Sequence, residues 1–154
     1  MNMKSSFLYH FYPVGQGLFS TGSIHLLADR EAEFRWVYDC GTTSAGSLIV
    51  DSIEKLERDI DKRNRIDLLT LSHFDKDHIS GVTALLEKFK IGTLLLPYLT
   101  LEQRLVLIFE QGIETDDPLI TFYINPVEYL LQQEGPGINR ILFVPASGEQ
   151  GPPP

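Results

Sequence analysis

Residues 66–81 read Ile-Asp-Leu-Leu-Thr-Leu-Ser-His-Phe-Asp-Lys-Asp-His-Ile-Ser-Gly. The first half of this stretch contains a short apolar run, Leu68–Leu71, which is typical of a buried strand. At Ser72 the run changes into a polar cluster that places two imidazoles and two carboxylates within six residues. The members of this cluster are His73, Asp75, Asp77 and His78.

Two imidazoles and two carboxylates so close together favour a bound cation. Ionised carboxylates in a crevice repel one another and lose hydration, and a divalent ion offsets both costs. Imidazole and carboxylate are ligands for zinc and its neighbours. Because alternate side chains of an extended segment share a side, we expect His73, Asp75 and Asp77 to converge and His78 to point elsewhere. The alternative is a solvated loop in which the aspartates cap the next helix and the histidines are incidental.

The pattern His-x-Asp-x-Asp-His, after a hydrophobic strand and before Gly81, resembles the metal-binding signature of the metallo-β-lactamase superfamily. The commoner signature has a histidine where this chain has Asp75. The aspartate form is similar to the hydrolase domain of competence-type DNA-uptake proteins and related bacterial members. A second match lies upstream, in Val14-Gly15-Gln16-Gly17 and in Val37-Tyr38-Asp39-Cys40-Gly41. Together the two matches extend the resemblance over about residues 7–97.

The resemblance implies a metal-dependent hydrolase with one or two divalent ions. His73 and Asp75 would hold the first ion, and Asp77 and His78 the second. Asp77 would also act as the catalytic residue that orients the attacking water. Zinc is the expected metal, with manganese or iron as alternatives because Asp75 makes the first site richer in oxygen. The resemblance places Asp39 beside the metals as a hydrogen-bonding support, whereas its position alone equally fits an aspartate that caps a turn.

The resemblance also implies that part of the site is missing. The second half of such a domain normally adds two further histidines and a bridging aspartate, yet no histidine follows His78. Asp116 and Asp117 offer oxygen ligands without a positional reason to assign them. We therefore expect an α/β (α+β) fold that forms only the first half of an αββα sandwich, to be completed by a C-terminal half or a partner chain. The alternative is a complete small domain that binds one metal weakly or none.

Length and composition predict one globular domain. The chain has 154 residues, of which 43% are hydrophobic, enough for one core of ordinary size. The net charge of -8 provides no electrostatic footprint for nucleic acid. A single cysteine, Cys40, excludes an internal disulfide and is expected to be small and buried, with a thiol near the metal site as the alternative. We expect a domain over residues 1–147 and a disordered Gly/Pro tail over residues 148–154.

Hydrophobic periodicity and turn signals predict the order of the elements. Three antiparallel strands are expected at residues 7–14, 21–28 and 34–39, with a charged turn at 29–31. The turn Gly15-Gln16-Gly17 has two interpretations, a plain hairpin turn or a close approach of backbone to the metal cleft. The later elements are a helix at 47–62, a strand at 68–71, a helix at 82–89, a parallel strand at 91–96, a helix at 100–110, an acidic loop at 112–120, a helix at 126–133 and a strand at 138–144.

These observations lead to two competing hypotheses. In the first, the complete protein is a metal-dependent hydrolase of a phosphodiester (nucleic acid or nucleotide), and this chain alone is weak or inactive. The phosphodiester follows from the resemblance alone, and the acidic net charge gives it no support. In the second, the chain is a non-catalytic interaction module that keeps a vestigial or structural metal site. No stretch is long and apolar enough for a membrane span, so the expected location is the cytoplasm.

Overall fold

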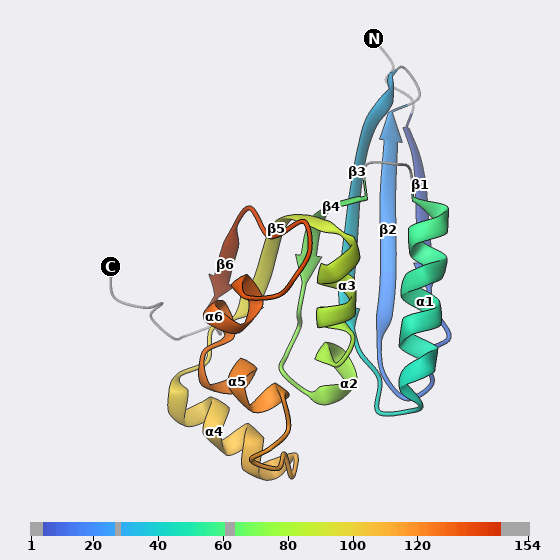
Figure 1. Cartoon of the computed structure of the whole chain (residues 1–154). Helices are drawn as coiled ribbons and strands as arrows, with labels where there is room; N and C mark the ends of the chain where they lie inside the picture. Colours follow the sequence, from blue (N-terminus) through green and yellow to red (C-terminus); the bar gives the residue numbers. More distant parts are fainter. Residues whose placement is uncertain (1–4, 27–28, 61–63, 146–154) are drawn as a thin grey trace.

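The computed structural model describes residues 5–26, 29–60 and 64–145. Its centre is a six-stranded sheet in which the spatial order of the strands, β1-β2-β3-β4-β5-β6, is also their order along the chain (Figure 1). The strands are β1 (Ser5–Phe11), β2 (Phe19–Leu26), β3 (Asp29–Cys40), β4 (Arg65–Thr70), β5 (Lys90–Pro97) and β6 (Ile141–Val144).

The sheet is antiparallel in its first half and parallel in its second. β1, β2 and β3 form the predicted meander, and β3, β4, β5 and β6 run parallel. Parallel neighbours need crossover connections, which helices supply. The helices are α1 (Gly46–Asp59) between β3 and β4, α2 (Lys76–Ile79) and α3 (Val82–Lys88) between β4 and β5, and α4 (Leu101–Glu110), α5 (Leu119–Ile124) and α6 (Pro126–Leu131) between β5 and β6.

One face of the sheet is covered by helices and forms the core. α1 and α3 lie side by side across this face (Figure 1). Val37, Leu69 and Leu94 from the strands and Ile53 and Leu85 from these two helices are each 0% exposed. The apolar residues of α1, which recur every three or four positions, therefore face the sheet, and its charged residues face solvent.

The opposite face of the meander carries exposed aromatic rings. Leu8 and His10 of β1 face α1, so the alternate residues of this strand point the other way. The Phe7 ring lies 5.6 Å from that of Trp36, and the Tyr9 ring lies 6.1 Å from it. Phe7 and Phe11 are 65% and 69% exposed, an unusual fraction for phenylalanine. We call this surface the aromatic face, and its residues are Phe7, Tyr9, Phe11, Phe34 and Trp36.

The fold class predicted from the sequence is confirmed, and most elements lie where the periodicity places them. The capping box at Thr100 and Gln103 begins α4 as predicted, and Asn125 caps α6. Two predicted ends are wrong by several residues. The first strand ends at Phe11 because Pro13 cannot continue the ladder, and the last strand begins at Ile141.

Two segments differ in kind from the prediction. The charged turn expected at 29–31 is wrong, because β3 begins at Asp29, which pairs with Leu26. The register then shifts, and pairing resumes between Glu33 and His25. The acidic loop expected at 112–120 is too long, because α5 begins at Leu119 and buries Phe122 and Tyr123. The aromatic and β-branched residues of α5 have low helix propensity, and their burial against the loop after β4 outweighs it.

Parts of other predictions lie outside the described residues. These include the end of the helix expected at 47–62, which the structure follows to Asp59, and the Gly/Pro tail at 148–154. Among the helices of the described ranges, none is long and apolar enough to cross a membrane.

Candidate metal centre

The candidate ligands lie near the carboxyl ends of β3 and β4. Asp39 is the next-to-last residue of β3, and residues 71–75 form the loop that follows β4. Asp77 and His78 lie in α2, a single helical turn that begins at Lys76. Ligands of α/β proteins bind at this edge of the parallel strands, where the connecting loops meet.

The structure brings two overlapping groups of ligand atoms together. One atom each from His73, Asp75 and Asp77 lies within 4.8 Å of the others, and the same holds for Asp39, His73 and His78. His73 belongs to both groups. The side chains of His73 and Asp75 are each 46% exposed, so the cluster is open to solvent on this side.

His78 does not point away from the cluster, so the expectation from strand alternation is wrong for this residue. The backbone becomes helical at Lys76, and the alternation of an extended chain ends there. The ring centroids of His73 and His78 are 3.8 Å apart. Asp77 therefore joins the cluster from a helical turn, beside His78. Asp75 is the N-cap residue of α2, but its side chain makes no capping hydrogen bond of the kind that the alternative interpretation expected.

Asp39 collects the hydrogen bonds behind the cluster. Its Oδ1 accepts the backbone N–H of Ser72 at 2.7 Å, and its Oδ2 accepts the Ser72 hydroxyl at 2.6 Å. Nδ1 of His78 lies 2.8 Å from the same Oδ2. Asp39 is 0% exposed, and a buried carboxylate is tolerated only when its oxygens have such partners.

These contacts fix the proton positions of both imidazoles. A carboxylate only accepts, so the proton of neutral His78 sits on Nδ1. Ser72 gives its single hydroxyl proton to Asp39, so its Oγ accepts the Nδ1 proton of His73 at 2.7 Å. Each neutral imidazole then presents the lone pair of Nε2 to the cluster. Ser72 is a functional candidate that the sequence pattern did not single out, although it precedes His73 directly.

A β-bulge aims Asp39 at the cluster. The register between β2 and β3 shifts so that Ser20 pairs with Tyr38 and Phe19 pairs with Cys40, which leaves Asp39 without a partner. Its φ of 57° lies in the left-handed region, which aspartate adopts more readily than most residues. Bulges beside functional sites redirect a side chain in this way.

We call residues 71–78, which carry the four candidate ligands, the metal loop. Two glycines allow the backbone to approach this loop closely. A Cβ on Gly41 would lie 2.6 Å from the backbone of His78, and one on Gly17 would lie 2.8 Å from the carbonyl oxygen of Asp77. Leu18 donates its N–H to that same carbonyl at 3.1 Å. These contacts support the close-approach interpretation of the Gly15-Gln16-Gly17 turn.

Other sequence candidates lie outside the two ligand groups. Cys40 is 0% exposed, as expected of a small core residue. Burial is the larger cause, and the negative charge of Asp39 the smaller cause, of the raised pKa of its thiol. Asp117 pairs with Lys76 at 3.4 Å instead of facing the imidazoles. Neither Asp116 nor Asp117 belongs to a ligand group among the described residues.

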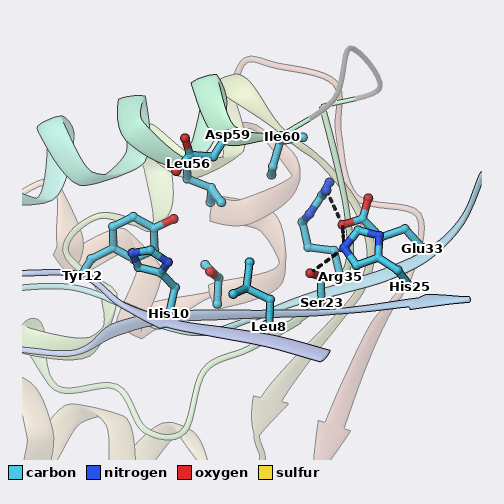
Figure 2. A pocket seen from close by; sticks show the side chains of 12 residues that line it. Leu8, His10, Tyr12, Ser23, His25, Glu33, Arg35, Leu56, Asp59 and Ile60 are labelled. Carbon is cyan, nitrogen blue, oxygen red and sulfur yellow. Dashed lines mark hydrogen bonds and ion pairs between the residues drawn. The ribbon is translucent and has the colours of Figure 1, made fainter. Parts of the chain in front are cut away.

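His10 and His25 line a separate cavity between α1 and the meander (Figure 2). At one end of it, Nε2 of His25 lies 3.1 Å from Oγ of Ser23 and 3.3 Å from Oε1 of Glu33. A serine nucleophile needs its base and its orienting acid on opposite ring nitrogens, whereas here both partners use Nε2. This trio is therefore no catalytic relay, and neither histidine belongs to a ligand group of the described residues.

The sheet and the ligand cluster together define an α/β protein with a candidate metal centre at the carboxyl ends of its parallel strands. Residues 21–139 match the metallo-beta-lactamase superfamily, and the chain belongs to this superfamily. Its members bind divalent metal ions, and membership indicates a metal-dependent hydrolase. The comparison with curated proteins gives no match.

The residues present fit a divalent ion. Nε2 of His73 lies 3.5 Å from Oδ2 of Asp75, and Nε2 of His78 lies 3.4 Å from Oδ2 of Asp77. Imidazole nitrogen beside carboxylate oxygen suits zinc, manganese or iron. Histidine ligands of metals usually donate their other N–H to a carboxylate or another acceptor, as both imidazoles do here.

Proposed function

We propose that the chain carries the first half of the active site of a metal-dependent phosphodiesterase, with nucleic acid or a nucleotide as substrate. The observation that carries this proposal is that Nε2 of each imidazole, in His73 and in His78, lies beside a carboxylate. The buried carboxylate of Asp39 contacts His78 directly and His73 through Ser72. His73 and Asp75 would hold one ion, and Asp77 and His78 a second. The resemblance to competence-type DNA-uptake hydrolases supports the choice of a phosphodiester, because this chain has Asp75 where the commoner superfamily signature has histidine.

Asp39 and Ser72 prepare the two histidines for this role. Their hydrogen bonds keep Nδ1 protonated and Nε2 free, so no proton has to move before a ligand binds. The chemistry supplied by a bound divalent ion is activation of water and polarisation of the scissile phosphorus–oxygen bond. Asp77, whose side chain is 32% exposed beside His78, is the carboxylate placed to accept a proton from the attacking water.

We further propose that a second body, a C-terminal half or a partner chain, completes this site. All seven residues of β1 are exposed, and β1 is an edge strand of the sheet. Edge strands and large exposed apolar surfaces are protected in stable proteins by a covering element. The same body would add ligands on the open side of His73 and Asp75. Before it docks, we expect weak or no turnover.

The aromatic face also favours a second candidate function, a non-catalytic interaction module. In that case the rings of the aromatic face bind a protein partner, and the ligand cluster serves structure only. The two functions differ in one respect that can be measured. The hydrolase cleaves a phosphodiester in a reaction that depends on the metal, whereas the interaction module cleaves none even if its cluster holds a structural metal.

The test is elemental analysis of the purified chain, of an Asp77→Ala/His78→Ala variant and of an Asp51→Ala/His10→Ala control. The control removes the same two residue types from exposed positions away from the cluster. We expect zinc, manganese or iron in the unmodified chain and the control, and its loss in the first variant. A model phosphodiester, bis-p-nitrophenyl phosphate, then reports slow hydrolysis that depends on the metal. Folded proteins that all lack metal after incubation with each ion would overturn the proposal.

A further inference from the structure

We propose that Gln111 and Tyr123, from the segment between β5 and β6, are positioning residues that hold Asp75 in place for metal binding. The inference rests on the proposed function, because Asp75 is taken as a ligand. Both residues lie outside the sequence motifs that predicted the ligands, and neither belongs to a ligand group of the described residues.

The side-chain amide of Gln111 contacts the metal loop with both of its polar atoms. Its Nε2 donates to Oδ1 of Asp75 at 2.9 Å, and its Oε1 accepts the backbone N–H of Lys76 at 3.1 Å. One planar group thus fixes the carboxylate of one residue and the backbone of the next. Hydrogen bonds to a charged acceptor are among the stronger ones in proteins.

Tyr123 supports the same loop from behind. Its hydroxyl donates to the carbonyl oxygen of Phe74 and lies 3.2 Å from Oε1 of Gln111. The rings of Phe122 and Tyr123 pack edge-on against Phe74, with centroids 4.8 Å and 6.4 Å away. Burial raises the pKa of Tyr123 to about 12, so the hydroxyl keeps its proton and remains a donor at neutral pH.

The element that carries Gln111 is itself well anchored. Gln111 is the C-cap residue of α4, and its backbone N–H bonds to the carbonyl of Leu107. A capping box with Thr100 closes the other end of the helix. A second contact joins the same segment to the loop, because Asp117 pairs with Lys76 at 3.4 Å.

The consequence for the metal centre lies in the two oxygens of Asp75. Gln111 engages Oδ1, so Oδ2 is the oxygen that faces Nε2 of His73, at 3.5 Å. With its side chain 46% exposed, a carboxylate without this amide would rotate freely, and ordering it would cost conformational entropy on metal binding. Gln111 offsets that cost before the ion arrives, as a preformed site requires.

The experiment is a titration of the metal-free chain with cobalt(II), followed by its visible absorption, with zinc competition for the affinity. The variants are Gln111→Met, which keeps the length of the side chain without its polar atoms, and Tyr123→Phe, which removes only the hydroxyl. Gln132→Met is the matched control, because Gln132 is exposed and its amide donates to the carboxylate of Glu128 at 3.2 Å. Circular dichroism checks that each variant is folded.

We expect cobalt and zinc affinity to fall about 10–100-fold in Gln111→Met, with a shifted cobalt spectrum, and to fall less in Tyr123→Phe. The control should match the unmodified chain. If the unmodified chain binds cobalt while a folded Gln111→Met or Tyr123→Phe variant keeps its affinity and spectrum, the inference is overturned and the proposed function stands. If the unmodified chain binds neither metal, the proposed function fails and this inference fails with it.

Discussion

Oδ2 of Asp39 lies 2.8 Å from Nδ1 of His78, so a residue buried at the end of β3 sets the proton position of an imidazole in the metal loop. The same oxygen accepts the hydroxyl of Ser72, which in turn bonds to His73. One carboxylate therefore orients both histidines of the candidate metal centre. The strand bulge and the left-handed backbone at Asp39 place the carboxylate where it can make these contacts.

Replacement of Asp39 by asparagine tests this relationship. Asparagine has the same shape, but one of its two acceptor oxygens becomes an NH₂ donor that faces Ser72 or His78. We expect metal affinity to fall about 10–100-fold, and stability to fall by about 1–3 kcal/mol as buried polar groups lose partners. Zinc titration and thermal unfolding measure the two effects. Asp51→Asn, on the exposed side of α1, should leave both unchanged, and an equal loss in this control would contradict the assignment.

Ser72→Ala tests the support of His73 separately from that of His78. The change breaks the link between His73 and Asp39 but leaves the contact between Asp39 and His78. We expect a smaller loss of metal affinity than in Asp39→Asn. In a double-mutant cycle, Ser72→Ala should cost little once Asp39 is already asparagine, because both changes act on the same chain of hydrogen bonds. Additive losses measured by zinc titration would show that Ser72 acts independently of Asp39.

Gly41→Ala tests the close packing beneath α2. A Cβ at this position would lie 2.6 Å from the backbone of His78, so α2 would have to move. We expect a loss of about 1–3 kcal/mol in the free energy of unfolding, together with weaker metal binding. Gly46→Ala is the control, because a Cβ there meets nothing within 4 Å at the start of α1. It should be neutral or stabilising by about 0.4–1 kcal/mol, and a similar loss in both variants would argue against the steric cause.

The sequence predicted the parts of the site that lie close together along the chain. Four candidate ligands of two types, histidine and aspartate, within six residues after an apolar strand predict a metal-binding loop without reference to the rest of the fold. The predicted direction of the His78 side chain was wrong because a helix of four residues, such as α2, is too short to show a helical period in the sequence. A pattern of alternating side chains therefore holds only until the backbone changes its conformation.

The contacts made over long sequence separations could not be predicted in the same way. Asp39 is 39 residues from His78, and Gln111 is 36 residues from Asp75. The role of Asp39 depends on a bulge that becomes visible only in the register of β2 and β3. Gln111 ends a helix whose capping signals were clear, but nothing local indicates which loop its side chain meets.

The buried phenol of Tyr123 predicts that the stability of the chain depends on pH. Burial raises its pKa from the ordinary value of 10.0 to about 12, so the folded chain keeps a proton that the unfolded chain loses. The folded state binds more protons between pH 10 and 12, so stability must fall as pH rises through this window. We expect the melting temperature of the metal-free chain to fall more steeply there than that of Tyr123→Phe. The buried thiol of Cys40 also resists ionisation, but it contributes equally to both proteins and cancels in the comparison. Parallel curves for the two proteins above pH 10 would show that Tyr123 ionises without disturbing the loop, and the hydrogen bond to Phe74 would then contribute little to the fold.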